Sequence, residues 1–169
     1  EIVVRGPCIT RAYDRNDEAN AKSKIADGDT VWHRMGDCGA LDDAGRLWFC
    51  GRKAHRVVKA NGVTLHSIPV EAVVEANIAS CNRAALVGVG PRGRQRAVVV
   101  LELVLCARFV RDDVLARVRA LPGCAEIDDV LPWTGAFPVD RRHNAKIERE
   151  QLAAYATTRL PALANGAAS

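Results

Sequence analysis

The stretch Gly51-Arg52-Lys53-Ala54-His55-Arg56 divides the chain into two parts whose sequence patterns differ. Before it, short β-branched or aromatic runs alternate with turn residues, which predicts strands. After it, helical patterns alternate with apolar runs of strand length, which predicts helices packed on a sheet. We therefore predict an α+β domain with a mixed sheet over residues 55–160, a β-rich segment over residues 1–51 and a connection at residues 52–54.

The β-rich part carries one clear hairpin signal. Asp42-Asp43-Ala44-Gly45 predicts a tight turn, because glycine accepts a positive φ and aspartate favours turns. Gly36-Asp37 breaks the strand that precedes this hairpin. The polar residues 11–30 predict a loop with one helical turn near residues 17–22. The predicted strands cover residues 2–5, 31–41 and 47–50.

The second part begins with a short predicted hairpin around Asn61-Gly62. Pro69 suits the first turn of a helix, and the apolar side of that helix includes Val70 and Val74. A basic turn at residues 91–96 joins two apolar strands. The predicted helices cover residues 69–78, 112–120 and 145–155, and the predicted strands cover residues 57–58, 63–65, 84–89, 97–106 and 127–131. Residues 161–169 are small and polar and predict a disordered tail.

The composition argues against several classes of protein. No run reaches the roughly 18 apolar residues that a membrane span needs, and no secretory signal is recognisable, so we expect a cytoplasmic protein without a membrane span. None of the six cysteines forms a C-x-x-C pair, so reduced thiols are expected rather than a zinc site. The net charge of +4 is dispersed among residues of both signs, so no nucleic-acid partner is expected. A non-catalytic basic module that binds nucleic acid or protein stays an alternative.

Three polar residues stand where their chemistry suggests a site. Asp37 lies at the strand break between Gly36 and Gly39, and its carboxylate can accept two hydrogen bonds from a vicinal diol. The Arg52 guanidinium offers a fork for a phosphate or a ribose, and Lys146 offers positive charge to a phosphoryl group. The structural alternatives are a turn-capping aspartate, a surface ion pair and an exposed helix lysine.

Taken in order, these segments resemble the adenylate-forming ligase superfamily, which includes acyl-CoA synthetases, luciferase and the adenylation domains of peptide synthetases. The resemblance extends over residues 1–155, and its main motifs are Glu1–Pro7, Gly36-Asp37-x-Gly39, the hairpin Leu41–Leu47, Gly51-Arg52 and Lys146-Ile147-x-Arg149. It implies the C-terminal part of a larger enzyme. Residues 1–51 would end the β-subdomain of a large N-terminal domain, and residues 55–160 would form a small lid domain.

The resemblance assigns roles to the polar residues. Asp37 and Arg52 would bind the nucleotide, and Lys146 would be the catalytic lysine that arrives when the lid closes. Two positions depart from the family pattern, because Met35 replaces its usual threonine and Ala145 replaces its usual glycine.

The resemblance also makes residues 52–54 the hinge on which the lid turns. Ala54 stands where the family has an aspartate or a lysine. His55 and His143 flank the two catalytic motifs, so they are candidates for a base in a second reaction step. The histidines are not spaced as metal ligands, so no metal-ligating residue is predicted in this chain.

Three stretches indicate one branch of the superfamily. Trp32–Asp37, Gly51–Arg56 and Val139–Ile147 resemble the β-lactone synthetases of bacterial long-chain olefin biosynthesis, formerly named fatty acyl-CoA ligases. This implies that ATP activates a long-chain 2-alkyl-3-hydroxy acid as an acyl-adenylate, with Mg²⁺ bound mainly by the missing N-terminal domain. The substrate's own hydroxyl would displace AMP and close the lactone. Other olefin-biosynthesis enzymes would be partners.

The alternative enzyme is a fatty acyl-CoA ligase, which forms a thioester instead of a lactone. In both cases the family's phosphate-binding loop, adenine pocket and acyl tunnel would lie in the missing N-terminal domain. The chain alone is therefore expected to be inactive.

Overall fold

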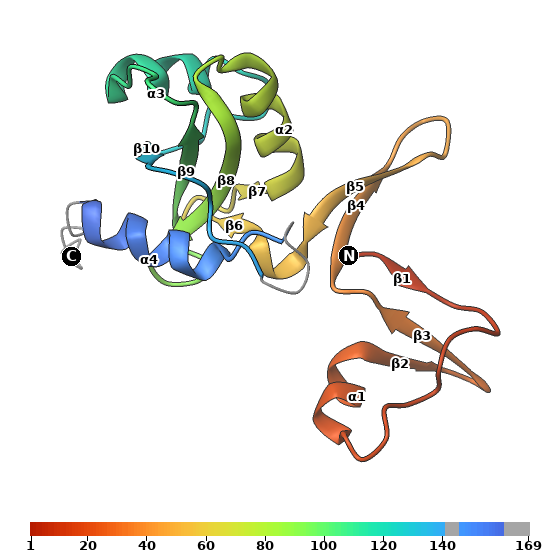
Figure 1. The fold of residues 1–169 in the computed structure, drawn as a ribbon. Coiled ribbons are helices and arrows are strands. Elements are labelled where there is room, and N and C mark those ends of the chain that lie inside the picture. The colour runs from red at the N-terminus through yellow and green to blue at the C-terminus, as the bar shows by residue number, and fades with distance from the viewer. Residues whose placement is uncertain (141–145, 161–169) are drawn as a thin grey trace, which may run out of the picture. The chain divides into compact units, whose positions relative to one another are not determined.

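The computed structural model describes residues 1–140 and 146–160, and it divides the chain into two compact units at Ala54 and His55 (Figure 1). The first unit contains a three-stranded antiparallel sheet and a separate β-hairpin. In the sheet, β3 (Thr30–Arg34) lies between β1 (Val3–Val4) and β2 (Lys24–Asp27). The hairpin joins β4 (Asp37–Leu41) to β5 (Leu47–Arg52).

Residues 11–30 contain a helix and a strand, whereas the sequence predicted mainly a loop. α1 (Asp17–Ser23) begins where the Asn16 side chain accepts a hydrogen bond from the Ala19 amide at 3.0 Å. β2 follows α1 directly and pairs with β3 through a turn at Gly28, whose φ is +54°. Most of β2 is exposed, so this strand lacks the apolar alternation that marks strands in a sequence.

The predicted turn at Asp42–Gly45 is confirmed. Gly45 has a φ of +74°, and its amide donates to the Asp42 carbonyl oxygen at 2.9 Å. The Asp42 carboxylate accepts hydrogen bonds from the Trp48 indole at 2.9 Å and from the Arg46 amide at 2.9 Å. These hydrogen bonds favour the ionised form and lower the pKa of Asp42, with that from Trp48 contributing the most.

The second unit is built on a three-stranded mixed sheet. β9 (Arg96–Leu103) lies between β8 (Cys81–Val89), which is antiparallel to it, and β10 (Asp129–Trp133), which is parallel to it. Three helices pack on this sheet: α2 (Ser67–Asn77), α3 (Arg111–Arg119) and α4 (Arg149–Arg159). The predicted fold class, an α+β domain with helices on a mixed sheet, is confirmed for this unit.

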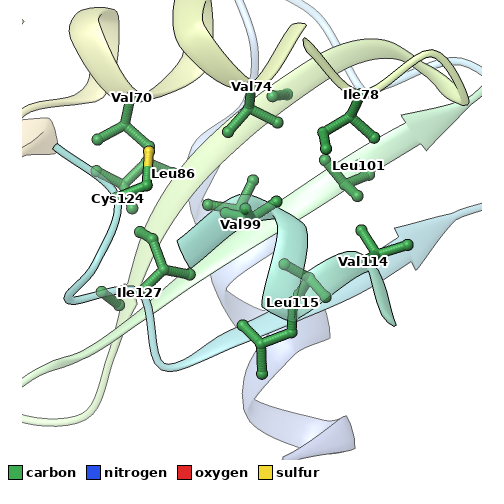
Figure 2. Packing of buried hydrophobic residues seen from close by; sticks show 14 of the residues in the cluster. Val70, Val74, Ile78, Leu86, Val99, Leu101, Val114, Leu115, Cys124 and Ile127 are labelled. Atoms are coloured by element: carbon green, nitrogen blue, oxygen red, sulfur yellow. The ribbon is translucent and has the colours of Figure 1, made fainter. Parts of the chain in front are cut away.

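The two faces of the sheet bury alternate residues of the same strands. Val99 and Leu101 contribute to the core under α2 and α3, while Val98 and Val100 contribute to the core under α4. This period of two is what strand geometry requires when helices cover both faces. Figure 2 shows the core under α2 and α3. Side chains of the two helices and of Ile78, the C-cap of α2, meet those of the sheet there: Val70, Val74, Ile78, Val114 and Leu115 with Leu86, Val99 and Leu101.

Two predicted elements have different ends. The strand predicted to reach Cys106 ends at Leu103, because the chain turns there and Cys106 has a φ of +61°. The helix predicted from Ala145 begins at Arg149, because Ile147 is paired with Val139 in a β-bridge and Glu148 does not have helical dihedral angles. Ala145 itself and the predicted tail at residues 161–169 lie outside the described residues.

A 3₁₀ turn and a short hairpin lie in the chain between β5 and α2. Lys53–His55 form one 3₁₀ turn, and β6 (Val57–Val58) and β7 (Thr64–Leu65) form the hairpin predicted around Asn61-Gly62. Gly62 has a φ of +84°, and its amide donates to the Lys59 carbonyl oxygen at 3.0 Å. In the part of the chain that the structure describes, every helix is too short or too polar to cross a bilayer.

Candidate functional site

Asp37 and Arg52 are register partners on the β4–β5 hairpin. Arg52 Nη1 lies 3.2 Å from Asp37 Oδ1 and donates a hydrogen bond of 3.2 Å to the Met35 carbonyl oxygen. Asp37 Oδ1 is buried and accepts no hydrogen bond from any described residue, so its contact with Arg52 is one of charge. The Arg52 side chain is 59% exposed. The hairpin therefore presents an accessible guanidinium beside a carboxylate.

The predicted hinge residues lead from β5 into the 3₁₀ turn. The Lys53 amide donates to the Gly36 carbonyl oxygen at 2.8 Å, and Lys53 Nζ donates to the Glu1 carboxylate at 2.7 Å. The hydrogen bond from Lys53 is the main cause of a lowered pKa at Glu1. Lys53 thus ties the turn to the first unit, while Ala54 is exposed and His55 is half-buried. His143 lies outside the described residues.

Lys146 belongs to a short two-stranded segment, the Lys146 ribbon, made of residues 137–140 and 146–149. Val139 and Ile147 form a β-bridge, and the Asp140 amide donates to the Lys146 carbonyl oxygen at 2.9 Å. The Glu148 amide donates to the Pro138 carbonyl oxygen at 2.9 Å. Lys146 is exposed. Its backbone is therefore fixed by pairing while its side chain stays available to solvent.

The ribbon leads into a buried ion pair between Arg149, at the start of α4, and Glu71 of α2. Arg149 Nη2 donates to Glu71 Oε2 at 2.9 Å, and Nη1 donates to Glu71 Oε1. Glu71 Oε1 also accepts from the Leu86 amide at 2.7 Å, and Arg149 Nη1 donates to the Leu86 carbonyl oxygen at 3.3 Å. Glu71 is 7% exposed. Burial raises the pKa of Glu71, and Arg149 acts in the opposite direction.

No role was predicted for Glu71 from the sequence, although a signal for it exists. Glu71 directly follows Val70 on the apolar side of α2, where a carboxylate is costly unless it is paired. Arg149 was part of the motif Lys146-Ile147-x-Arg149, but its partner, 78 residues away in the chain, could not be read from that motif.

Each unit contains one part of the predicted site. The structure brings Asp37 to Arg52 in the first unit and joins Lys146 to the Arg149–Glu71 pair in the second. Among the residues that the structure describes, no group of three or more His, Cys, Asp or Glu could hold a metal ion. The chemistry available here is therefore that of lysine and arginine cations and of one partly exposed carboxylate.

Comparison with known proteins identifies relatives over nearly the whole chain, although no family model matches it. The chain is 45% identical to an olefin beta-lactone synthetase of Xanthomonas campestris pv. campestris, over 92% of this chain and 29% of that protein. It is 44% identical to an olefin beta-lactone synthetase of Stenotrophomonas maltophilia, over 95% of this chain and 30% of that protein. The chain thus spans less than a third of the length of these relatives and matches their C-terminal part.

Solved structures show the same fold. The amide bond synthetase McbA from Marinactinospora thermotolerans has a TM-score of 0.72 at 23% identity, with 90% of this chain and 30% of that chain covered. The ATP-bound MatB from Rhodopseudomonas palustris has a TM-score of 0.72 at 17% identity, with 92% and 31% covered. The likeness in fold and the sequence identity to the two synthetases are consistent with each other. The chain is therefore a relative of the olefin beta-lactone synthetases that matches their C-terminal part, and it has the fold of the adenylate-forming ligases.

Proposed function

We propose that this chain is the lid-bearing C-terminal part of an enzyme that uses ATP to convert a long-chain 2-alkyl-3-hydroxy acid into a β-lactone. The observation that carries the proposal is the identity of 45% and 44% to two olefin beta-lactone synthetases over more than nine-tenths of the chain. A 2-succinylbenzoate–CoA ligase of Bacillus licheniformis reaches 35%, and over only 44% of this chain.

In the first step a carboxylate oxygen of the substrate attacks the α-phosphorus of ATP. A bond from that oxygen to phosphorus forms, the bond from phosphorus to the pyrophosphate oxygen breaks, and pyrophosphate leaves. Negative charge is redistributed over the phosphoryl oxygens, so a cation held at the right place lowers the barrier. Lys146 supplies that cation in this proposal, since it is exposed on a backbone fixed by pairing.

Asp37 and Arg52 hold the nucleotide in this proposal. A ribose diol can donate hydrogen bonds to the Asp37 carboxylate, and the exposed Arg52 guanidinium can turn toward a ribose or phosphate oxygen. ATP binding is supported by the likeness to the ATP-bound MatB structure. No described residue group suits Mg²⁺, so no step here is assigned to the metal, which the rest of the enzyme would hold.

In the second step the substrate's 3-hydroxyl oxygen attacks the carbonyl carbon of the acyl-adenylate. The new C–O bond closes the four-membered ring, and the bond from the carbonyl carbon to the oxygen that bridges it to phosphorus breaks. AMP leaves with that former carboxylate oxygen, and the hydroxyl proton passes to a base. His55 and His143 are the candidate bases in this chain. Because the nucleophile is already attached to the substrate, no CoA is required.

The domain roles are part of the same proposal. Residues 52–54 would act as the hinge between the β-rich part and the lid, and the phosphate-binding loop and acyl tunnel would lie in the remainder of a longer protein. Residues 1–169 alone are therefore expected to show no synthetase activity. Six free cysteines support a reducing compartment such as the cytoplasm.

The test uses the full-length protein with ATP, Mg²⁺ and a long-chain 2-alkyl-3-hydroxy acid, without CoA. Mass spectrometry should detect AMP and β-lactone. Lys146→Ala should lower the rate about 100- to 1,000-fold, because a charge that stabilises the transition state is lost. Lys22→Ala, which removes an exposed lysine from α1, is the matched control and should leave the rate unchanged.

A fatty acyl-CoA ligase is the second candidate, because several relatives are 2-succinylbenzoate–CoA ligases. AMP release that depends on added CoA, with a thioester as product, would select it. No AMP under either condition would reject adenylate formation and favour a non-catalytic module.

A further inference from the structure

Two glutamates are buried in the second unit, and both bind the Lys146 ribbon. Glu71 of α2 is 7% exposed and Glu102 of β9 is 6% exposed. Glu71 pairs with Arg149 at one end of the ribbon, and Glu102 Oε2 accepts a hydrogen bond from the Phe137 amide, 2.6 Å long, at the other end. A buried carboxylate requires partners, and here the partners are the two ends of one segment.

The two anchors attach the ribbon to different parts of the core. Glu102 lies in the middle strand of the sheet and also accepts a hydrogen bond from the Asn82 side chain on β8. Glu71 reaches the Leu86 amide on the same β8 strand, at 2.7 Å. Both carboxylates are thus fixed by the sheet as well as by the ribbon. Displacing either end of the ribbon would leave a buried carboxylate short of a partner.

The described residues between the anchors, 138–140 and 146–148, are paired with one another. The Val139–Ile147 bridge and the amides of Asp140 and Glu148 connect the two sides of the ribbon. Lys146 is separated from Arg149 by only two residues, so the position of its Cα follows that of the anchored guanidinium. A lysine on a free loop would instead sample many positions, and each would have to be restricted during the reaction.

We propose that Glu71, acting through Arg149, is a positioning residue that fixes the Lys146 ribbon on the core and so sets where the catalytic lysine is presented. Glu102 performs the same task at the Phe137 end. This inference rests on the proposed role of Lys146 in adenylate formation. Neither glutamate touches the substrate; each acts on the reaction only through the backbone that bears Lys146.

The test is a double-mutant cycle on pyrophosphate release by the full-length protein. Glu71→Gln/Arg149→Gln removes both charges but keeps an acceptor for the Leu86 amide, so the fold survives where a lone buried charge would destabilise it. This paired variant should lower kcat about 100-fold with an unchanged KM for ATP. In the Lys146→Ala background it should have no further effect, because the lysine that it positions is gone.

The matched control is Arg111→Gln/Asp129→Asn. It removes another ion pair of the same unit, in which Asp129 is buried and the Arg111 side chain is 49% exposed, with Nη2 and Oδ2 2.7 Å apart. Neither residue belongs to the Lys146 ribbon. Its kcat should be unchanged. An equal loss of rate in both variants, or an equal loss with and without Lys146, would mean that Glu71 only stabilises the fold and would overturn the inference.

Hydrogen exchange gives a readout that does not depend on activity. The Asp140 and Glu148 amides, which pair the ribbon, should exchange at least 10-fold faster in the Glu71→Gln/Arg149→Gln variant, while the Val99 amide in the core should not change. If Lys146→Ala alone leaves pyrophosphate release intact, the proposed function fails. If Lys146→Ala abolishes release but the paired variant changes neither rate nor exchange, only the positioning role fails.

Discussion

Arg52 and Arg149 each lie beside a carboxylate, but breaking the two contacts has very different costs. Arg52 is 59% exposed, and an ion pair of this kind stabilises a protein by only about 0–1 kcal/mol. Arg149 lies against a buried glutamate, where losing one partner costs about 3–5 kcal/mol. Arg52 can therefore leave its partner at little cost, as the nucleotide contact proposed for it requires, whereas Arg149 is held in place.

Burial also determines the chemistry of Cys81. This thiol is 9% exposed, and its burial, with smaller contributions from Glu75 and Glu102, raises its pKa to about 12. We expect it to resist thiol reagents at pH 8, while the exposed Cys8 and Cys106 react within minutes. Peptide mapping by mass spectrometry after brief alkylation measures this difference. Rapid labelling of Cys81 in the folded protein would contradict the burial.

The raised pKa has a defined effect on stability. Between pH 9 and about 12 the unfolded chain releases the Cys81 proton and the folded chain keeps it, so the free energy of unfolding falls as the pH rises through that window. Lys59, whose pKa is raised mainly by its hydrogen bond to Asp128 against the opposing effect of burial, adds a loss of stability of the same sign.

At the scale of elements, Gly88 marks where β8 meets the β6 strand. A Cβ at Gly88 would lie 2.3 Å from Gln95 Nε2, and Gln95 Oε1 accepts a hydrogen bond from the Val58 amide at 3.2 Å. Gly88→Ala should therefore displace Gln95 and lower the free energy of unfolding by about 1–3 kcal/mol, measured by denaturant titration.

Two control variants separate this contact from a general effect of the substitution. Gly6→Ala has no atom within 4 Å of the new Cβ and should be nearly neutral. In a Gln95→Ala background, Gly88→Ala should cost much less, because the clash is absent. The same loss with and without Gln95 would point to the backbone rather than the side chain.

Local chemistry explains which elements the sequence could reveal. The Asp42–Gly45 turn was predictable because a carboxylate and a glycine meet there, and the apolar side of α2 was predictable from Val70 and Val74. β2 was not predictable, because a mostly exposed strand needs no alternation of apolar and polar residues. The late start of α4 depends on a bridge between Val139 and Ile147, which no local propensity signals.

Part of the candidate site was likewise predictable from the sequence and part was not. Asp37, Arg52 and Lys146 could be named from ordered motifs, and the structure pairs the first two on one hairpin. The pairing of Glu71 with Arg149 could not be predicted, since the two residues lie 78 positions apart in the chain. The roles of Asp37, Arg52, Lys146 and Glu71 in catalysis stay predictions until the variants are measured.

At the scale of the whole molecule, the two units differ in how much core they possess. Within residues 1–54, all of which the structure describes, Cys38 is the one buried hydrophobic side chain. Large side chains of the β4–β5 hairpin are exposed there: Leu41 by 71%, Leu47 by 57%, Trp48 by 58% and Phe49 by 50%. The second unit has apolar cores on both faces of its sheet.

This difference predicts the behaviour of the separate units. Residues 55–160 should unfold cooperatively on their own, whereas residues 1–54 should lack a stable fold without a covering partner, because a small unit with almost no core cannot offset its chain entropy. Circular dichroism during thermal unfolding of each piece tests this. A cooperative transition in residues 1–54 alone would show that the exposed hairpin needs no partner.

One face of the sheet is covered by α4, which is synthesised after the three strands. The order matters while the ribosome is still making the chain. The three strands are complete once Trp133 has emerged, yet Val98 and Val100 stay uncovered until Leu152 and Ala156 follow. At roughly 5–20 residues per second, that interval lasts about 1–5 seconds. During it the nascent protein displays a bare apolar sheet, which is the kind of surface that chaperones bind and that neighbouring nascent chains can capture.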